Sequence, residues 1–284
     1  MRGGGRLCAI SVFGQEAQLD TWRMAKINLA IRGIDANLGD SNGDTFFDDK
    51  HPTLKADIIL ANPPFNLKAW GQEKLTDDVR WKYGIPPANN ANYAWIQHMI
   101  HHLSPRGKIG LVLANGSLTS QTGGEGEIRK AIIEDDLVEA IVALPPQLFY
   151  SVQIPVSLWF FNRKKPQPGK TVFIDARQMG VMEDRTHKVI TPEEIQKIAD
   201  TVHKFQRGET VDEKGFAAVV TTEEIAKQDY MLTPGRYVGI AERKDDDEPI
   251  SVKLPRLQKE LAAMFEESHR LEAEIKKQLA GVKL

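Results

Sequence analysis

Short apolar runs alternate with amphipathic segments along most of the first 176 residues. Apolar runs that end at turn or polar residues are typical of strands, and they occur at residues 7–13, 56–61, 108–114, 138–144 and 155–162. Helical spacing of apolar residues predicts helices at 18–32, 92–103 and 125–134. Strands and helices that alternate in this way predict an α/β fold built on a parallel sheet.

The segments around this alternation are more polar. Residues 155–162 and 171–174 are joined by a turn-forming segment, which predicts a closing hairpin. Residues 70–90 are rich in Pro, Gly and Asn, so we expect a mobile loop there. Beyond Ala176, Thr and Glu twice stand three residues apart before an apolar residue. This spacing predicts two helix starts with capping boxes, at Thr191 with Glu194 and at Thr221 with Glu224.

The last segment has residues spaced alternately by four and three, as in a coiled-coil seam. The seam consists of Leu257, Leu261, Met264, Ser268, Leu271, Ile275 and Gln278. Ser268 and Gln278 are polar, so a helix packed on its own domain explains the pattern nearly as well. We expect three parts: an α/β domain at 1–176, a helical extension and linker at 177–248, and a heptad-patterned helix at 249–284.

The composition narrows the class of protein. A chain of 284 residues is long enough for one or two domains. Its net charge is −2, so the chain lacks the excess of basic residues that is typical of a protein that binds nucleic acid by itself. Affinity for nucleic acid therefore needs a local basic patch or a partner protein. A single cysteine, Cys8, excludes an internal disulfide framework. No stretch approaches the roughly 20 apolar residues of a membrane span. We therefore expect a cytoplasmic protein without membrane contact.

The tetrapeptide Asn62-Pro63-Pro64-Phe65 follows the apolar run at 56–61, where α/β sheets place their ligands. The Asn side-chain oxygen and a Pro carbonyl can accept both hydrogens of a planar amine, and Phe65 can stack on its ring. Accepting both N–H bonds frees the nitrogen lone pair for attack on an electrophile, so no ionisable base is required. The alternative is a strand-to-loop turn that carries prolines.

Further motifs accompany this tetrapeptide, at residues 13–16, 42–46, 57–70, 91–98, 125–130, 144–150 and 228–237. With them the chain resembles the methylase subunit of type I restriction-modification systems, from about Ser11 to the end. The tetrapeptide alone would also fit RNA and protein N-methyltransferases. The resemblance implies an adenine-N6 DNA methyltransferase with a Rossmann-like sheet and S-adenosylmethionine as cofactor.

In that family a helical domain, the first and central strand of the sheet, and a glycine-rich cofactor loop come before these motifs. Residues 1–6 contain glycines but no Asp-Pro and no preceding strand. We therefore expect a partial methyltransferase domain that lacks this strand. The strands on either side of the gap would be left with unpaired edges.

Two acids are candidates for binding the cofactor. Glu16 follows the first predicted strand, where an acid can accept hydrogen bonds from ribose hydroxyls. By resemblance, Asp44 accepts from the cofactor's adenine amino group while Phe46 lies against the ring. Glu16 also fits a surface acid near a helix start. Asp44 also fits a turn residue in a loop crowded with other acids.

The substrate adenine must be flipped out of the DNA duplex to reach such a site. Phe65 is expected to hold one face of the base, and Phe149 and Tyr150 are candidates for the other. Phe149 as a core residue and Tyr150 as a loop aromatic remain the alternative.

The histidines His98, His101 and His102 are grouped within one predicted helix. They have neither cysteines nor a matching acid pair beside them. We therefore expect helix-surface histidines and no metal site.

The resemblance also implies partners. The tail at 253–281 would meet the specificity subunit that reads DNA, and through it the restriction (nuclease) subunit and a possible second methylase copy. Two alternatives stay open: a non-catalytic fragment that only docks on the specificity subunit, and the carboxyl-terminal half of a split methyltransferase.

Overall fold

A computed structural model of the protein describes residues 10–150, 153–240 and 250–280. The chain divides into two units, Met1–Ala241 and Glu242–Leu284, and each is considered by itself. None of the described helices combines the length and apolar character needed to cross a membrane.

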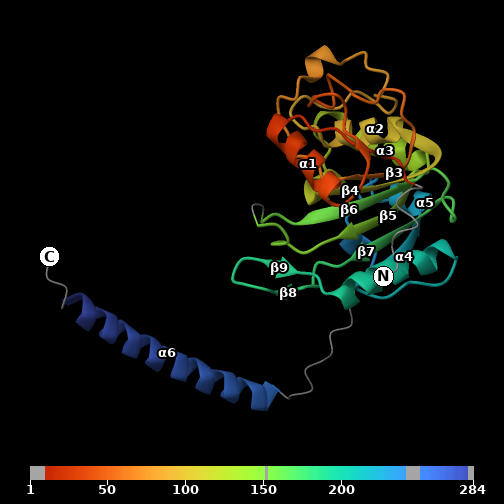
Figure 1. The fold of residues 1–284 in the computed structure, drawn as a ribbon. Coiled ribbons are helices and arrows are strands. Elements are labelled where there is room, and N and C mark those ends of the chain that lie inside the picture. The colour runs from red at the N-terminus through yellow and green to blue at the C-terminus, as the bar shows by residue number, and fades with distance from the viewer. Residues whose placement is uncertain (1–9, 151–152, 241–249, 281–284) are drawn as a thin grey trace. The chain divides into compact units, whose positions relative to one another are not determined.

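The first unit contains a six-stranded sheet with the order β10-β7-β5-β6-β4-β3 (Figure 1). The strands are β3 (Ala56–Ala61), β4 (Leu103–Ala114), β5 (Val138–Ala143), β6 (Val156–Asn162), β7 (Lys170–Asp175) and β10 (Ala217–Thr221). Four of them, β3, β4, β5 and β7, run in one direction, and β6 and β10 run in the other. The predicted α/β class with a mostly parallel sheet is confirmed.

Helices cover both faces of this sheet. Side chains of α2 (Asn92–His101), α3 (Glu125–Glu134) and α5 (Thr222–Ala226) join the larger apolar cluster on one face. The helix α4 (Pro192–Gln206) contributes Phe205 to a second cluster on the other face. All six residues of β5 are buried, which is the pattern of a strand covered on both sides.

The predicted hairpin of 155–162 with 171–174 is wrong, because β6 and β7 do not pair with each other. The strand β5 lies between them, antiparallel to β6 and parallel to β7. β6 has buried side chains on both faces: Trp159 and Phe161 enter the larger cluster, while Leu158 and Phe160 pack against the second. A strand that is apolar on both faces is most stable inside a sheet, and β6 takes the place between β4 and β5.

The amino-terminal strands lie apart from the main sheet. β1 (Val12–Phe13) and β2 (Ala36–Asn37) form a two-stranded parallel sheet, connected by α1 (Leu19–Ile31). β3 is the edge of the main sheet, and no strand in the described residues pairs with its outer side. On this edge strand Ile58 is 70% exposed and Leu60 is 79% exposed. The outer edge of β3 is therefore unpaired within the described part of the chain.

The structure differs from the predicted boundary after Ala176. The segment that follows contains a small hairpin, β8 (Val181–Met182) with β9 (Lys188–Val189), then α4, and then β10. β10 pairs with β7 and so extends the main sheet. The predicted helix starts are confirmed, since Thr191 and Thr221 both form capping boxes. The predicted linker, the charge run at 243–248, lies outside the described residues.

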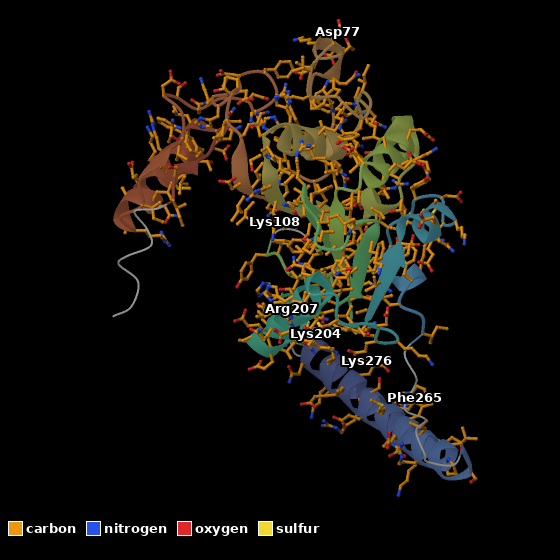
Figure 2. The ribbon with its side chains drawn as sticks, turned by 90° about the vertical axis from the view of Figure 1, so that its right-hand side faces the viewer. Asp77, Lys108, Lys204, Arg207, Phe265 and Lys276 are labelled. Atoms are coloured by element: carbon orange, nitrogen blue, oxygen red, sulfur yellow. The ribbon has the colours of Figure 1, made fainter. Side chains whose placement is uncertain are left out.

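The second unit contains α6 (Ile250–Ala280), where a heptad-patterned helix was predicted. Figure 2 labels Phe265 and Lys276 on this helix. Its apolar side chains are exposed: Leu257 to 44%, Leu261 to 53% and Leu271 to 44%. Residues 281–284 lie outside the described part of the chain. The exposed apolar side chains provide a surface that a second helix could cover.

Candidate active site at the carboxyl edge of the sheet

Asn62 follows directly after β3, at the carboxyl end of a strand that runs parallel to β4. Its side chain is exposed, whereas Pro63 is buried and Phe65 is half-buried. The buried ring of Pro63 anchors the motif and leaves the amide of Asn62 accessible from outside. This arrangement meets the first requirement of the predicted amine-binding chemistry, which a buried Asn62 could not fulfil.

The turn after Phe65 is fixed by two asparagines. Asn66 has a left-handed backbone with φ of +53°, a conformation that Asn tolerates better than most residues. The fully buried Asn92 accepts from the backbone N–H of Asn66 at 3.2 Å and donates to its side-chain oxygen at 3.0 Å. Asn92 is thus a positioning residue that the sequence analysis missed, although it lies in the motif at 91–98.

Phe65 and Phe149, the residues predicted for the two sides of the base, lie together and both pack against the second apolar cluster. Their ring centroids are 6.2 Å apart with an angle of 68° between the planes, an edge-to-face contact. A flat base stacked on both rings needs about 3.5 Å on each side, roughly 7 Å in all. Phe149 must therefore turn or shift before a base can enter between the two rings.

Tyr150 does not join this pair. Its side chain is 80% exposed, and its ring stacks on His187 with centroids 4.1 Å apart. His187 stands just before β9, so Tyr150 belongs with the β8–β9 hairpin in this conformation. The structure differs here from the prediction that Tyr150 lies against the base, because the neighbouring hairpin offers a closer ring.

The loops that carry Glu16 and Asp44 are held together by Gln15. The Gln15 side chain donates to the carbonyls of Gly43 and Asp48, at 3.0 and 2.8 Å, and accepts from the backbone of Lys50 at 2.8 Å. The backbone N–H of Gly43 also donates to the carbonyl of Glu16 at 2.9 Å. Segments far apart in the sequence thereby bring the two predicted cofactor acids into one region.

Each acid also makes the local contact that its alternative interpretation requires. Glu16 accepts from the backbone N–H of Gln18 at 2.8 Å, just before α1. Asp44 is exposed and accepts from the backbone N–H of Phe46 at 2.8 Å, as a turn residue does. Both carboxylates remain partly or fully accessible, so the local contact and a ligand contact are compatible.

Phe46 is not placed as predicted. Its side chain is only 4% exposed and packs against Trp95 and Trp70, with ring centroids 4.3 and 4.9 Å away. A ring enclosed in this way has no open face for a cofactor. The neighbouring Phe47 is 46% exposed and is the accessible ring of this loop.

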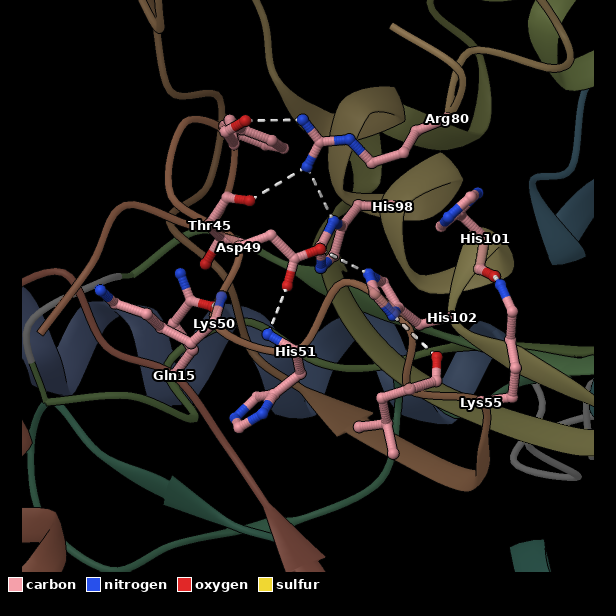
Figure 3. A network of polar contacts seen from close by, with 12 residues as sticks. Gln15, Thr45, Asp49, Lys50, His51, Lys55, Arg80, His98, His101 and His102 are labelled. Carbon is pink, nitrogen blue, oxygen red and sulfur yellow. Dashed lines mark hydrogen bonds and ion pairs between the residues drawn. The ribbon is translucent and has the colours of Figure 1, made fainter. Parts of the chain in front are cut away.

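His98 and His101 lie in α2, and His102 directly follows this helix (Figure 3). They differ from the prediction of surface histidines, since His102 is buried and His98 is half-buried. His102 lies between the carboxylate of Asp49 at 2.9 Å and the carbonyl of Leu54 at 3.0 Å. Burial, together with the electrostatic effects of the neighbouring His102 and Arg80 side chains, lowers the pKa of His98 to about 3. His98 is therefore neutral at physiological pH. The interaction partners come from residues about 50 positions earlier, which helix periodicity does not reveal.

Asp49, His98 and His102 place one potential metal-ligand atom each within 4.8 Å of one another. Arg80 nevertheless donates from Nη1 to Nδ1 of His98 at 3.1 Å. That contact leaves the ring proton on Nε2, and it places a guanidinium charge beside the cluster. A hydrogen-bonded network accounts for these residues better than a metal site does.

Comparisons with known proteins identify the family. The family model described as N-6 DNA Methylase matches residues 4–246. The type I restriction enzyme HindI methylase subunit of Haemophilus influenzae is 52% identical over 98% of this chain. The MjaIX methylase subunit of Methanocaldococcus jannaschii is 43% identical over 97%. The chain spans 63% and 50% of the length of these two relatives.

Solved structures agree with the sequence comparison. The type I restriction-modification system methyltransferase subunit from Streptococcus thermophilus has a TM-score of 0.71 and 28% identity. The similarity covers 80% of this chain and 48% of that one. With a matched family model over most of its length and Asn62 exposed at the sheet's carboxyl edge, the chain belongs to the N-6 DNA methylase family.

Proposed function

We propose that this chain provides the base-binding part of a DNA adenine-N6 methyltransferase of a type I restriction-modification system. The observation that carries the proposal is the motif 62–65: an exposed Asn62, a buried Pro63 and a half-buried Phe65 at the end of β3. Family membership and the named relatives support the same activity.

The chemistry follows from these groups. The Asn62 side-chain oxygen and the Pro63 carbonyl accept the two hydrogens of the adenine amino group. Pro64 has no N–H, and its ring keeps the backbone that presents the Pro63 carbonyl rigid. Phe65 stacks on the flipped base. Held in this way, the amine nitrogen directs its lone pair outward as a nucleophile, and no side chain needs to remove a proton first.

The residues of the 15–48 region suit S-adenosylmethionine. Glu16 and Asp44 offer carboxylate oxygens to hydroxyl and amino donors, and Gln15 holds their loops together. Phe47, rather than Phe46, offers an exposed ring to the cofactor's adenine. When bound, S-adenosylmethionine supplies the electrophilic methyl group.

Partners are proposed from the second unit and from the relatives. The exposed apolar side chains of α6 suit contact with a helix of the specificity subunit. The specificity subunit would then connect this chain to the restriction subunit and to a second methylase copy. A cytoplasmic location accords with a DNA substrate. The outer edge of β3, unpaired among the described residues, supports the alternative of a split methyltransferase whose missing strand another chain supplies.

The test measures cofactor binding and methyl transfer in the same samples. We expect the chain to bind S-adenosylmethionine weakly alone in calorimetry. Binding should strengthen when the part of the Haemophilus influenzae relative that this chain does not match is added. With the specificity subunit present, transfer of labelled methyl to DNA should then be lost in Asn62→Ala and kept in Asn28→Ala, an exposed asparagine of α1. Equal activity in the two variants would refute the proposed role of Asn62.

A further inference from the structure

Arg80 has every hydrogen-bond donor of its guanidinium occupied, and Figure 3 shows its contacts with Thr45 and His98. Nε and one Nη2 hydrogen bind the carboxylate of Asp78, at 2.8 and 2.6 Å. The other Nη2 hydrogen binds the carbonyl of Phe46 at 2.6 Å, and Nη1 binds the carbonyl of Thr45 at 3.0 Å and Nδ1 of His98 at 3.1 Å. A guanidinium has five N–H donors, and here five acceptor atoms meet them.

The two carbonyls that Arg80 binds lie in the turn headed by Asp44. The backbone of this turn is closed by the carbonyl of Asp44, which accepts from Asp48 at 2.7 Å, and by its carboxylate, which accepts from Phe46 at 2.8 Å. The turn has Arg80 on its inner side and the exposed side chain of Asp44 on its outer side. The direction in which Asp44 presents its carboxylate thus depends on contacts that Arg80 makes.

The surroundings make this contact selective for arginine. The Arg80 side chain is 8% exposed and that of Asp78 is 14% exposed, so the pair is shielded from solvent. Its neutral partner His98 accepts a hydrogen bond without adding positive charge. A lysine has three donors on a single nitrogen and cannot reach two successive carbonyls, a carboxylate and an imidazole at once.

The segment that carries Arg80 is also anchored. Trp70 and Trp81 are buried, and the indole of Trp70 donates to the carbonyl of Pro87 at 2.9 Å. Residues 70–90 therefore pack against the loop of Phe46 in place of the mobile loop that their composition predicts. This segment begins shortly after Phe65, so one guanidinium connects the chain that follows the base site to the turn that carries Asp44.

We propose that Arg80 is a positioning residue of the cofactor site, which orders the turn at 44–48 so that Asp44 can meet S-adenosylmethionine. The inference rests on the proposed function for the identity of the ligand. Arg80 does not touch the cofactor in this account. It acts through the carbonyls of Thr45 and Phe46.

The chain contains a matched control. Arg177 binds Asp175, two residues before it, with the same pair of distances, 2.8 Å from Nε and 2.6 Å from Nη2. Its side chain is 47% exposed, and it holds no part of the turn at 44–48. Arg80→Lys and Arg177→Lys thus make the same chemical change in the same local motif at two places.

The experiment compares wild type, Arg80→Lys and Arg177→Lys in the full chain with its partners. We expect faster amide hydrogen exchange at residues 44–48 in Arg80→Lys only. We also expect a roughly tenfold weaker Kd and higher KM for S-adenosylmethionine, with kcat within about threefold of wild type. Arg177→Lys should resemble wild type in all of these measurements.

The outcomes separate this inference from the proposed function. If wild type binds S-adenosylmethionine and Arg80→Lys binds it equally well, the inference is overturned and the proposed function stands. If wild type with its partners binds no S-adenosylmethionine, the proposed function fails, and the cofactor role of Arg80 fails with it. A lower kcat with an unchanged Kd would also overturn the inference, since it would show that Arg80 acts on the reaction instead of on cofactor binding.

Discussion

Acidification should destabilise this protein through His98. Burial and nearby positive charge lower the pKa of His98 to about 3, compared with 6.5 for an ordinary histidine. Between these two values the unfolded chain binds a proton at this position and the folded chain does not. The free energy of unfolding therefore falls as the pH falls from about 6.5 towards 3, and it is unaffected by His98 above that range.

The size of the effect follows from the difference in pKa. Each pH unit in this window costs about 1.4 kcal/mol, so lowering the pH from 7 to 5 should remove about 2 kcal/mol through His98 alone. Such a loss is a large part of the stability of an ordinary domain, about 5–15 kcal/mol. Urea unfolding at pH 7, 6 and 5 measures it directly.

The variant His98→Gln isolates this contribution. Its amide oxygen can still accept from Arg80, but the side chain does not titrate, so the fall between pH 7 and 5 should be smaller than in wild type by about 2 kcal/mol. His203→Gln, at an exposed position near the end of α4, should keep the wild-type fall. An identical pH dependence in wild type and His98→Gln would refute the reasoning.

The remaining predictions concern single contacts. Phe65→Ala should raise the KM for DNA about 5- to 150-fold, from a loss of roughly 1–3 kcal/mol of base stacking, with little change in Tm; an unchanged KM would contradict its role. Phe46→Ala should lower the free energy of unfolding by about 3–5 kcal/mol in urea denaturation, whereas Phe47→Ala should change it little; similar losses would show that Phe46 is not the core residue. Leu261→Glu with Leu271→Glu should abolish binding of the specificity subunit in a pull-down and leave the Tm of the first unit unchanged, and retained binding would exclude this face of α6.

The sequence predicted those helices, strands and capping boxes that residues close together in the chain define. The strand at 56–61 and the helix at 125–134 have the predicted bounds, because apolar periodicity and flanking turn residues define them. The two capping boxes depend on residues three positions apart, and both are present. The position of Asn62 at the end of its strand followed from the same local signals.

Features that depend on distant residues were missed. The position of β6 inside the sheet depends on its pairing with both β4 and β5, which the local sequence does not reveal. The short strand β10 can be recognised only from its pairing with β7. Phe46 and Phe47 are adjacent and identical in type, so only the tryptophans that enclose one of them decide which is exposed.

The unpaired outer edge of β3 affects how newly synthesised copies of this protein associate. Residues 56–61 form an apolar six-residue run with one charged side chain, Asp57, which is bound to Ser104 at 2.8 Å. Within the described residues no strand pairs with the outer side of β3, and such a run with unpaired backbone donors and acceptors is a template for self-association. In newly synthesised copies, a partner must therefore pair with this edge before two copies associate through it. Asn62 follows directly after this stretch, so the proposed site adjoins a strand edge that can pair with another copy of the chain.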